Sequence, residues 1–403
     1  MTTTGNTADV IILGAGVMGA SIAFHLAQLK AGRIVVLEKE NIGQGNSGRS
    51  SALVRMHYSF PPEVRLAVKS LEMFNHWKEL TGQTGDFHRT GFLRIVPETD
   101  LALLRANVQM QKSLGVNVEI VDRQQMQEIE PEWNFEDITA AAYEPDSGYG
   151  DGSCVANDFM AAARELGVEY RRRTLATRLL TCKSGRNGVN NDTAINRITG
   201  VEIGPEIIEA PVVIVALGPW SRPLLQSAGA DLPIENEFHE VVVLRNPPDM
   251  KGGGSACIDS VTTTYFRSDA SDKTLVGDFY GKRGADPSNF PQRPADESVE
   301  SIIERTCRRM PKLEHAEVMR GVTGVYDMTP DSRPILGEVP GIPGLYLAAG
   351  FSGMGFKISP AIGLVMAELI LDGASKTIDI SAFRPSRFAE GKPIKAEYEY
   401  ADD

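Results

Sequence analysis

Three glycines near the start of the sequence have the spacing of a phosphate-binding turn. Gly14, Gly16 and Gly19 follow a β-branched run at residues 9–13 that predicts a buried strand. The apolar spacing of residues 20–30 predicts a helix directly after them. The first glycine would permit a tight turn, the second a close approach of pyrophosphate, and the third close packing of helix on strand. Because a helix N-terminus attracts anions, this pattern predicts a dinucleotide site.

An acidic residue stands where such a site needs one. Glu38 ends a second strand-like run, residues 33–37, and lies 19 positions after Gly19. A carboxylate at this distance can accept hydrogen bonds from ribose hydroxyls. Val17 and Met18 within the glycine turn, and Lys39 beside the acid, are expected to contact the same ligand.

Composition limits the class of protein. The 403 residues suggest two domains or one elaborated domain, and the formal charge of −12 argues against nucleic acid as a partner. The cysteines, Cys154, Cys182, Cys257 and Cys307, have neither metal nor CxxC spacing, so we expect no metal site and a cytoplasmic location. Residues 10–29 are apolar but contain several glycines and polar residues, so no membrane span is expected.

Three further segments extend the glycine motif. They are GNSGRSS at residues 45–51, LGPWS at 217–221 and GLYLAAGFSGMGFK at 344–357. Together with the glycine turn, they resemble the D-amino-acid oxidase superfamily of flavoproteins. The closest resemblance is to the branch of sarcosine oxidase, glycine oxidase and dimethylglycine dehydrogenase, and it runs from about residue 9 to about residue 375.

The resemblance implies FAD as cofactor and adds residues to the expected binding site. A loop of glycines before a long helix that is expected to start at residues 360–364 could hold polar atoms of the flavin ring and stabilise negative charge on it. The expected additional contacts are Gly48, Arg49, Ser50, Ser51, Gly218, Trp220, Gly350, Gly353, Met354, Gly355, Phe356 and Lys357.

The implied fold is α/β, with a discontinuous Rossmann-like FAD-binding domain and an antiparallel-sheet substrate domain. Strand-like patterns at residues 90–96 and 240–245, and helical ones at 158–166 and 297–310, agree with it. The expected division assigns residues 1–90, 146–225 and 321–403 to the FAD-binding domain, and residues 91–145 and 226–320 to the substrate-binding domain.

The implied reaction is oxidation of the C–N bond of a secondary or N-methyl amino acid, with a hydride equivalent passing to the flavin and the imine then hydrolysed. A carboxylate substrate requires buried cations. Arg55 and Lys357 match positions that bind the substrate carboxylate in monomeric sarcosine oxidase. Surface or salt-bridge roles are the alternatives for both residues.

Three more residues are candidates for the active site. Tyr326 matches an active-site tyrosine of that enzyme, although a core tyrosine has the same pattern. His57 could face the flavin or substrate, or be structural. In the oxidases of this family, a buried lysine over the flavin activates O2, and Lys282 lies near the matching region of this sequence. An ordinary lysine of a surface loop is at least as good an interpretation of Lys282.

The sequence departs from the family where the cofactor is attached. Gly324 stands at the position of the cysteine that links FAD in monomeric sarcosine oxidase, and Met354 stands where a histidine is often found. Non-covalent FAD is therefore expected.

Several alternatives stay open at this point. The chain could be the flavin subunit of a hetero-oligomeric amino-acid or opine dehydrogenase, giving electrons to a partner rather than to O2. It could also be a 2-hydroxy-acid dehydrogenase with His57 as base, or an FAD-binding protein without turnover. Homo-oligomerisation is equally open. The portion from Lys376 onward has few apolar residues and is expected to be an extended tail or a partner contact.

Overall fold

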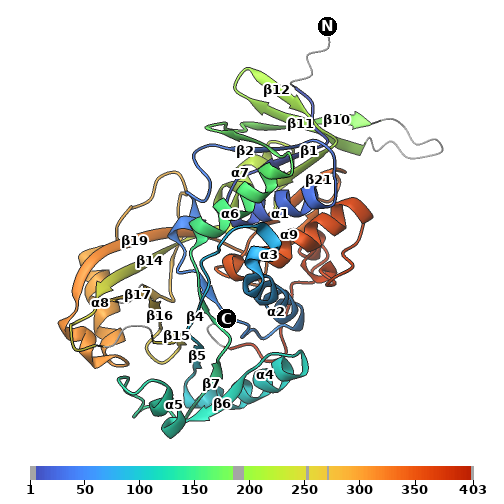
Figure 1. Cartoon of the computed structure of the whole chain (residues 1–403). Coiled ribbons are helices and arrows are strands. Elements are labelled where there is room, and N and C mark those ends of the chain that lie inside the picture. The colour runs from blue at the N-terminus through green and yellow to red at the C-terminus, as the bar shows by residue number, and fades with distance from the viewer. Residues whose placement is uncertain (1–5, 185–194, 251–253, 270–271, 401–403) are drawn as a thin grey trace.

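The computed structural model describes residues 6–184, 195–250, 254–269 and 272–400. Within them, a six-stranded sheet of order β20-β21-β13-β1-β2-β9 forms one layer (Figure 1). Its strands are parallel except for β20, which pairs antiparallel with β21. They are β1 Val10–Leu13, β2 Ile34–Glu38, β9 Glu169–Arg172, β13 Val212–Val215, β20 Ile335–Glu338 and β21 Leu345–Ala349.

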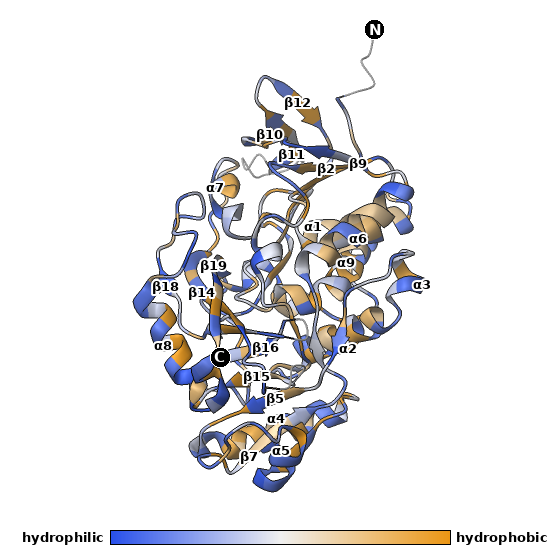
Figure 2. Ribbon diagram, turned by 60° about the vertical axis from the view of Figure 1, so that its left-hand side comes forward, coloured by the Kyte–Doolittle hydropathy of each residue, from blue (hydrophilic) through white to orange (hydrophobic). Residues whose placement is uncertain are grey.

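Apolar helices bury one face of this sheet. Helices α1 (Val17–Gln28) and α9 (Gly355–Asp372), mostly apolar in Figure 2, pack against each other. Helix α1 also packs against α6 (Gly152–Glu165), and α9 also packs against α2 (Pro61–Asn75). A parallel sheet covered by helices needs continuous apolar strands, and residues 10–13 are fully apolar and buried. The sheet and helices together place the glycine turn at the carboxyl end of β1.

A second, largely antiparallel sheet forms the other main layer. Its order is β18-β14-β17-β16-β15-β5-β7-β6, with β19 also paired to β14. The strands are β5 Phe92–Ile95, β6 Glu119–Asp122, β7 Ala140–Glu144, β14 Glu235–Arg245, β15 Ala256–Asp259, β16 Thr264–Ser268, β17 Lys273–Asp278, β18 Lys282–Arg283 and β19 Glu317–Met328. Amphipathic α8 (Asp296–Cys307) covers part of it, with distinct apolar and polar sides in Figure 2. The mixed α/β fold expected from the sequence is confirmed.

Smaller elements complete the described chain. Two three-stranded sheets have the orders β10-β11-β12 and β3-β8-β4. Their strands are β10 Arg178–Ser184, β11 Ile195–Ile203, β12 Glu206–Glu209, β3 Leu53–Val54, β8 Gly148–Tyr149 and β4 His88–Arg89. The remaining helices are α3 Trp77–Thr81, α4 Leu101–Ser113, α5 Arg123–Ile129 and α7 Ser221–Gln226.

The expected domain division stays a prediction. Strand β19 spans the expected boundary at residue 321 and pairs with β14 on both sides of it. The four strand and helix segments expected at 90–96, 240–245, 158–166 and 297–310 fall on β5, β14, α6 and α8, with shifted ends.

The segment from Lys376 folds back onto the protein, so the expectation of an extended tail is wrong for its described part. Ile378, Ile380 and Phe383 are buried in the largest apolar cluster, together with Tyr400. These buried apolar side chains stabilise the segment on the protein, and a fully buried Arg387 pairs with Asp331. Across the described residues, no helix has both the length and the apolarity needed to cross a bilayer.

Candidate functional site

A cavity of about 830 Å³ opens at the carboxyl ends of β1, β2 and β13. In open α/β sheets, ligands bind at this end of the parallel strands. Of the residues expected to bind the cofactor, the lining includes Gly14, Gly16, Val17, Met18, Glu38, Lys39, Arg49, Ser50, Gly218, Trp220, Gly353, Gly355 and Phe356. The expected contacts absent from its wall are Gly19, Gly48, Ser51, Gly350, Met354 and Lys357.

The glycine turn has the geometry that backbone binding requires. Gly14 has φ +99°, and a Cβ there would lie 2.5 Å from the carbonyl oxygen of Ala216. A Cβ on Gly19 would lie 1.9 Å from the carbonyl oxygen of Gly14, so this glycine permits α1 to pack against the turn. A Cβ on Gly16 would meet only Ser47 Oγ, at 3.0 Å, and otherwise project into space. Gly16 therefore leaves room for a ligand, whereas the other two glycines shape the turn.

The acidic residue is fixed at the cavity wall. Glu38 accepts hydrogen bonds from the backbone N–H groups of Ala15, at 2.9 Å, and Glu40, at 2.8 Å. Lys39 Nζ lies 3.9 Å above the ring of Trp220, whose buried Nε1 has no partner among the described residues. The cradle at Gly16, the fixed carboxylate and the orphaned indole N–H fit a dinucleotide.

The other end of the cavity is built by the loop after β21. Asp327 Oδ2 accepts hydrogen bonds from the backbone N–H groups of Gly350, at 2.5 Å, and Phe351, at 3.3 Å. Burial raises the pKa of Asp327 to about 6, against the lowering effect of these bonds. A Cβ on Gly353 would lie 2.7 Å from the Tyr326 ring. The loop is thus held by an aspartate and pressed against an aromatic ring.

Two residues expected to contact the cofactor have other partners instead. Gly48 is packed behind the wall, because a Cβ there would lie 2.8 Å from the carbonyl oxygen of Gly43. The Ser51 carbonyl oxygen accepts a 2.5 Å hydrogen bond from Arg267 Nε. Both residues therefore pack behind the residues that line the cavity and are not part of the lining themselves.

Arg55 and Lys357 lie together beside this loop. Lys357 is buried in the first turn of α9, and its Nζ lies 3.4 Å from the carbonyl oxygen of Gly353. Arg55 lies over the Tyr58 ring at 4.4 Å and donates a hydrogen bond to the carbonyl oxygen of His57. Burial, and then the nearby Arg55 charge, lower the pKa of Lys357 well below its usual range. Two cations whose charges act on each other favour an anion between or beside them.

His57 lies behind Arg55 in a buried polar chain. Its Nε2 is 2.9 Å from Tyr400 Oη, and its Nδ1 is 3.8 Å from Glu144 Oε1. Burial, followed by the charges of Arg94 and Arg55, lowers the pKa of His57, so the ring is neutral near pH 7. Glu144 Oε2 accepts hydrogen bonds from the Met56 N–H and the Ser147 hydroxyl. Burial nevertheless raises the pKa of Glu144.

Tyr326 and Lys282 have very different surroundings. Tyr326 is half-buried on the cavity wall, and its ring stacks on His239 with centroids 3.9 Å apart. The Lys282 side chain is 68% exposed and pairs with Glu240 at 3.4 Å. The structure therefore does not bring Lys282 to the buried cluster, because β18 lies at an edge of the antiparallel sheet.

Several residues of the site were not predicted from the sequence. Asp327 directly follows Tyr326 and lines the cavity, and Ser47 lies inside the GNSGRSS segment, where its Oγ accepts a hydrogen bond from the Val17 N–H at 3.0 Å. Glu144 and Tyr400 come from distant segments, and no local pattern marks them.

A sequence profile described as FAD dependent oxidoreductase matches residues 9–369. The chain belongs to this family of FAD-dependent oxidoreductases. The chain is 27% identical to FAD-dependent oxidoreductase domain-containing protein 1 of Bos taurus, over 95% of this chain and 85% of the relative. It is 29% identical to sarcosine oxidase subunit beta of Rhizobium meliloti (strain 1021), over 95% and 89% of the two chains.

A solved structure agrees with the fold. The crystal structure of L-proline dehydrogenase from P. horikoshii matches with a TM-score of 0.86 at 25% identity, covering 96% of this chain and 100% of that chain. The resemblance to flavoproteins of amino-acid oxidation is thereby confirmed, and the protein is an FAD-dependent oxidoreductase.

FAD fits the cavity described above. Gly16 and the N-terminus of α1 would face the pyrophosphate, Glu38 the ribose, and the loop at Gly353 and Gly355 the flavin end. Bound FAD supplies a two-electron acceptor for a hydride equivalent. The chain's own residues would bind and orient the molecule to be oxidised. The half-buried Arg55 and the buried Lys357 lie behind the glycine loop at this end of the cavity.

Proposed function

We propose that this FAD-dependent oxidoreductase oxidises the C–N bond of a secondary or N-methyl amino acid. The observation that carries the proposal is the pairing of Arg55 with Lys357 next to the glycine loop. A carboxylate seated between these cations would favour the charged form of Lys357, because an opposite charge counteracts the effect of burial. The named activities of the relatives, L-proline dehydrogenase and sarcosine oxidase subunit beta, are oxidations of such amino acids.

The roles of the remaining residues follow from this placement. Arg55 and Lys357 hold the carboxylate and so fix the carbon next to nitrogen against the flavin. Tyr326, on β19, forms part of the cavity wall next to the glycine loop. Neutral His57 lies within the cluster, and its main-chain oxygen accepts a hydrogen bond from Arg55. Gly324 offers no side chain for a thioether, and we propose that FAD is held non-covalently.

Anaerobic reduction of the flavin tests the proposal. Absorbance is followed with sarcosine, dimethylglycine, L-proline, D-amino acids and 2-hydroxy acids as separate reductants. We expect bleaching by a secondary or N-methyl amino acid, and readmitted air then distinguishes an oxidase from a dehydrogenase. Bleaching by 2-hydroxy acids alone would refute amine oxidation.

Variants of the cation pair sharpen this test. Arg55→Ala and Lys357→Met should lower the apparent affinity for the amino acid about 100-fold, within the range of about 2–5 kcal/mol for losing one buried charge partner. Lys376→Met is the matched control, since Lys376 is 70% exposed and lies beyond the other end of α9. If both cation variants keep the wild-type affinity for the amino acid, its carboxylate binds elsewhere.

A second candidate keeps the chemistry and changes the acceptor. One relative is named as a subunit, so this chain could pass its electrons to a partner subunit rather than to O2. A substrate-reduced flavin that is slow to reoxidise in air, but fast with an artificial electron acceptor, would favour this assignment. Rapid reoxidation by air would favour an oxidase.

A further inference from the structure

Tyr400 reaches the buried cluster from the far end of the described chain. It is 4% exposed, and its ring stacks on His57 at 5.9 Å with an interplanar angle of 18°. Its hydroxyl lies 2.9 Å from His57 Nε2. The Arg94 guanidinium lies 4.7 Å from the centroid of the same ring. A cation and an imidazole thus hold the tyrosine in a defined place.

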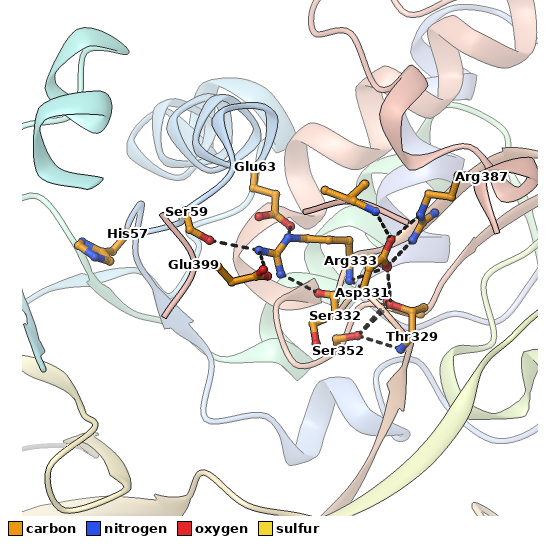
Figure 3. A network of polar contacts seen from close by, with 12 residues as sticks. His57, Ser59, Glu63, Thr329, Asp331, Ser332, Arg333, Ser352, Arg387 and Glu399 are labelled. Carbon is orange, nitrogen blue, oxygen red and sulfur yellow. Dashed lines mark hydrogen bonds and ion pairs between the residues drawn. The ribbon is translucent and has the colours of Figure 1, made fainter. Parts of the chain in front are cut away.

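The backbone around Tyr400 is anchored at several points, some of them shown in Figure 3. The Tyr398 carbonyl oxygen accepts a 2.8 Å hydrogen bond from Asn107 Nδ2 on α4. Glu399 pairs with the buried Arg333 at 3.2 Å, and Arg333 in turn pairs with Glu63 at 3.1 Å (Figure 3). Tyr398 and Glu399 therefore give the segment two anchors, one on α4 and one at Arg333.

A third anchor lies earlier in the segment. The Ile394 N–H donates to Asp331 Oδ2 at 2.8 Å, and the same carboxylate accepts two hydrogen bonds from Arg387, at 2.8 and 2.9 Å. Asp331 and Arg333 belong to one turn, which also holds Thr329 (Figure 3). This turn follows β19, the strand that carries Tyr326. One turn thus links the C-terminal segment to the cavity wall.

We propose that Tyr400 is a positioning residue for the substrate site, acting through His57. The inference rests on the proposed function, because that function assigns the Arg55 side of the cluster to the substrate. The Arg55 guanidinium donates a hydrogen bond to the main-chain oxygen of His57. A shift of His57 would therefore move Arg55, the residue that we propose binds the substrate carboxylate. Tyr400 thereby controls substrate binding without touching the substrate.

The hydrogen bond from Tyr400 also fixes the imidazole. A neutral imidazole has one donor and one acceptor nitrogen, and the partner of one nitrogen decides the state of the other. With Nε2 paired to the tyrosine hydroxyl, Nδ1 is the nitrogen directed toward Glu144. Loss of the hydroxyl would leave a buried ring free to turn or exchange tautomers, and would misplace the adjacent arginine.

Nitrogen NMR of the imidazole tests the positioning directly and needs no substrate. The FAD-loaded protein is labelled with 15N on its six histidines, and the His57 signals are assigned by their loss in His57→Asn. We expect one fixed tautomer in the wild type and averaged or exchanged 15N shifts in Tyr400→Phe. Tyr280→Phe, which changes a tyrosine that is 67% exposed, should leave the His57 signals unchanged. Unaltered His57 signals in Tyr400→Phe would overturn the inference.

Kinetics then connect the ring to the substrate. In anaerobic reduction by the amino acid that bleaches the wild type, Tyr400→Phe should weaken binding about 5- to 10-fold and change the limiting reduction rate less than twofold, the scale of one hydrogen bond. When Tyr400→Phe is added to His57→Ala, substrate binding should not weaken further, because the imidazole through which Tyr400 acts is already absent. Independent, multiplicative effects of the two changes would contradict positioning through His57.

The two proposals can fail separately. Averaged histidine signals in Tyr400→Phe, with no bleaching of the wild type by any amino acid, would reject the proposed function and preserve the structural coupling. Bleaching by a secondary amino acid, with unaltered histidine signals in Tyr400→Phe, would reject the role of Tyr400 alone.

Discussion

The cofactor cavity and the buried cluster beside it are built in opposite ways. The cavity is shaped by backbone, with Gly14, Gly16 and Gly353 at positions where a side chain would collide or fill space. The cluster is shaped by charged or polar side chains: the half-buried Arg55 and the buried His57 and Lys357. A cofactor common to many enzymes is held by groups that every residue possesses, whereas a particular substrate requires particular side chains.

The largest expected effect tests whether the glycines of the cavity have separate roles. Gly19→Ala places a methyl group 1.9 Å from the Gly14 carbonyl oxygen, so α1 must move away from the turn. We expect a loss of about 4 kcal/mol or more in unfolding free energy, together with loss of FAD binding. Urea denaturation of the apoprotein and a fluorescence titration with FAD measure the two effects.

Gly16→Ala is the matched control for that change. Its methyl group meets only Ser47 Oγ at 3.0 Å, so the apoprotein should stay within about 1 kcal/mol of the wild type while FAD affinity falls. Equal destabilisation by the two substitutions would show that both glycines serve packing, and the contrast between turn and ligand space would be lost.

The next effect concerns the side-chain region. Arg387→Met removes the cation that pairs with the buried Asp331, and breaking a buried pair costs about 3–5 kcal/mol. The C-terminal segment should become sensitive to protease, with little change in FAD affinity. Arg384→Met breaks a partly exposed pair with Glu390 and should leave the unfolding free energy close to that of the wild type. Loss of FAD in the Arg387 variant would mean that the two regions are not separable.

A pH effect arises inside the cavity itself. Burial raises the pKa of Asp327 from 3.8 to about 6, so the unfolded chain releases this proton first as pH rises. The stability contributed by Asp327 is therefore complete below pH 3.8 and is lost as pH rises through 6. At pH 7.5 the lost stability is on the order of 3 kcal/mol.

Asp327→Asn checks the sign of this effect. The amide oxygen can still accept the Gly350 N–H, and no charge is buried, so the variant should be more stable than the wild type at pH 7.5. Urea denaturation at pH 7.5 and pH 4 should show the advantage shrinking at the lower pH. An advantage of equal size at both pH values would exclude ionisation as its cause.

The smallest expected effect concerns a contact between a cation and an aromatic ring at the cavity wall, that of Lys39 with Trp220. Lys39→Met removes the ammonium 3.9 Å above Trp220, an interaction of about 0.5–1 kcal/mol. FAD affinity should fall about two- to fivefold in a fluorescence titration. A loss beyond about tenfold would assign Lys39 a direct contact with the nucleotide.

These comparisons explain what could be predicted from the sequence. The glycine turn and Glu38 were predictable because a strand, a turn and a helix within about thirty residues position them. Arg55 and Lys357 were found only through a resemblance. The contact of Met56 with Glu144 spans 88 positions and that of His57 with Tyr400 spans 343, so periodicity and spacing could not reveal them.

Strand register explains the misplaced lysine. Lys282 pairs with Phe238 at an edge of the sheet, and its side chain is exposed. The side chains of successive strand residues point to opposite faces, so only the register of β18 on β14 decides whether a lysine there is buried. Local sequence does not determine that register.

The order of strands in the parallel sheet also constrains how the protein can be made. Strand β1 lies beside β13, and β13 beside β21, so adjacent strands come from residues 10–13, 212–215 and 345–349. A growing chain cannot pair the outer edge of β13 until residues 345–349 of β21 have been synthesised, more than 120 positions later. During that time an apolar strand edge stays open to other chains, which favours chaperone binding and slow, late closure of the sheet. A nascent chain stalled before residue 345 should therefore aggregate, even though its glycine turn is already complete.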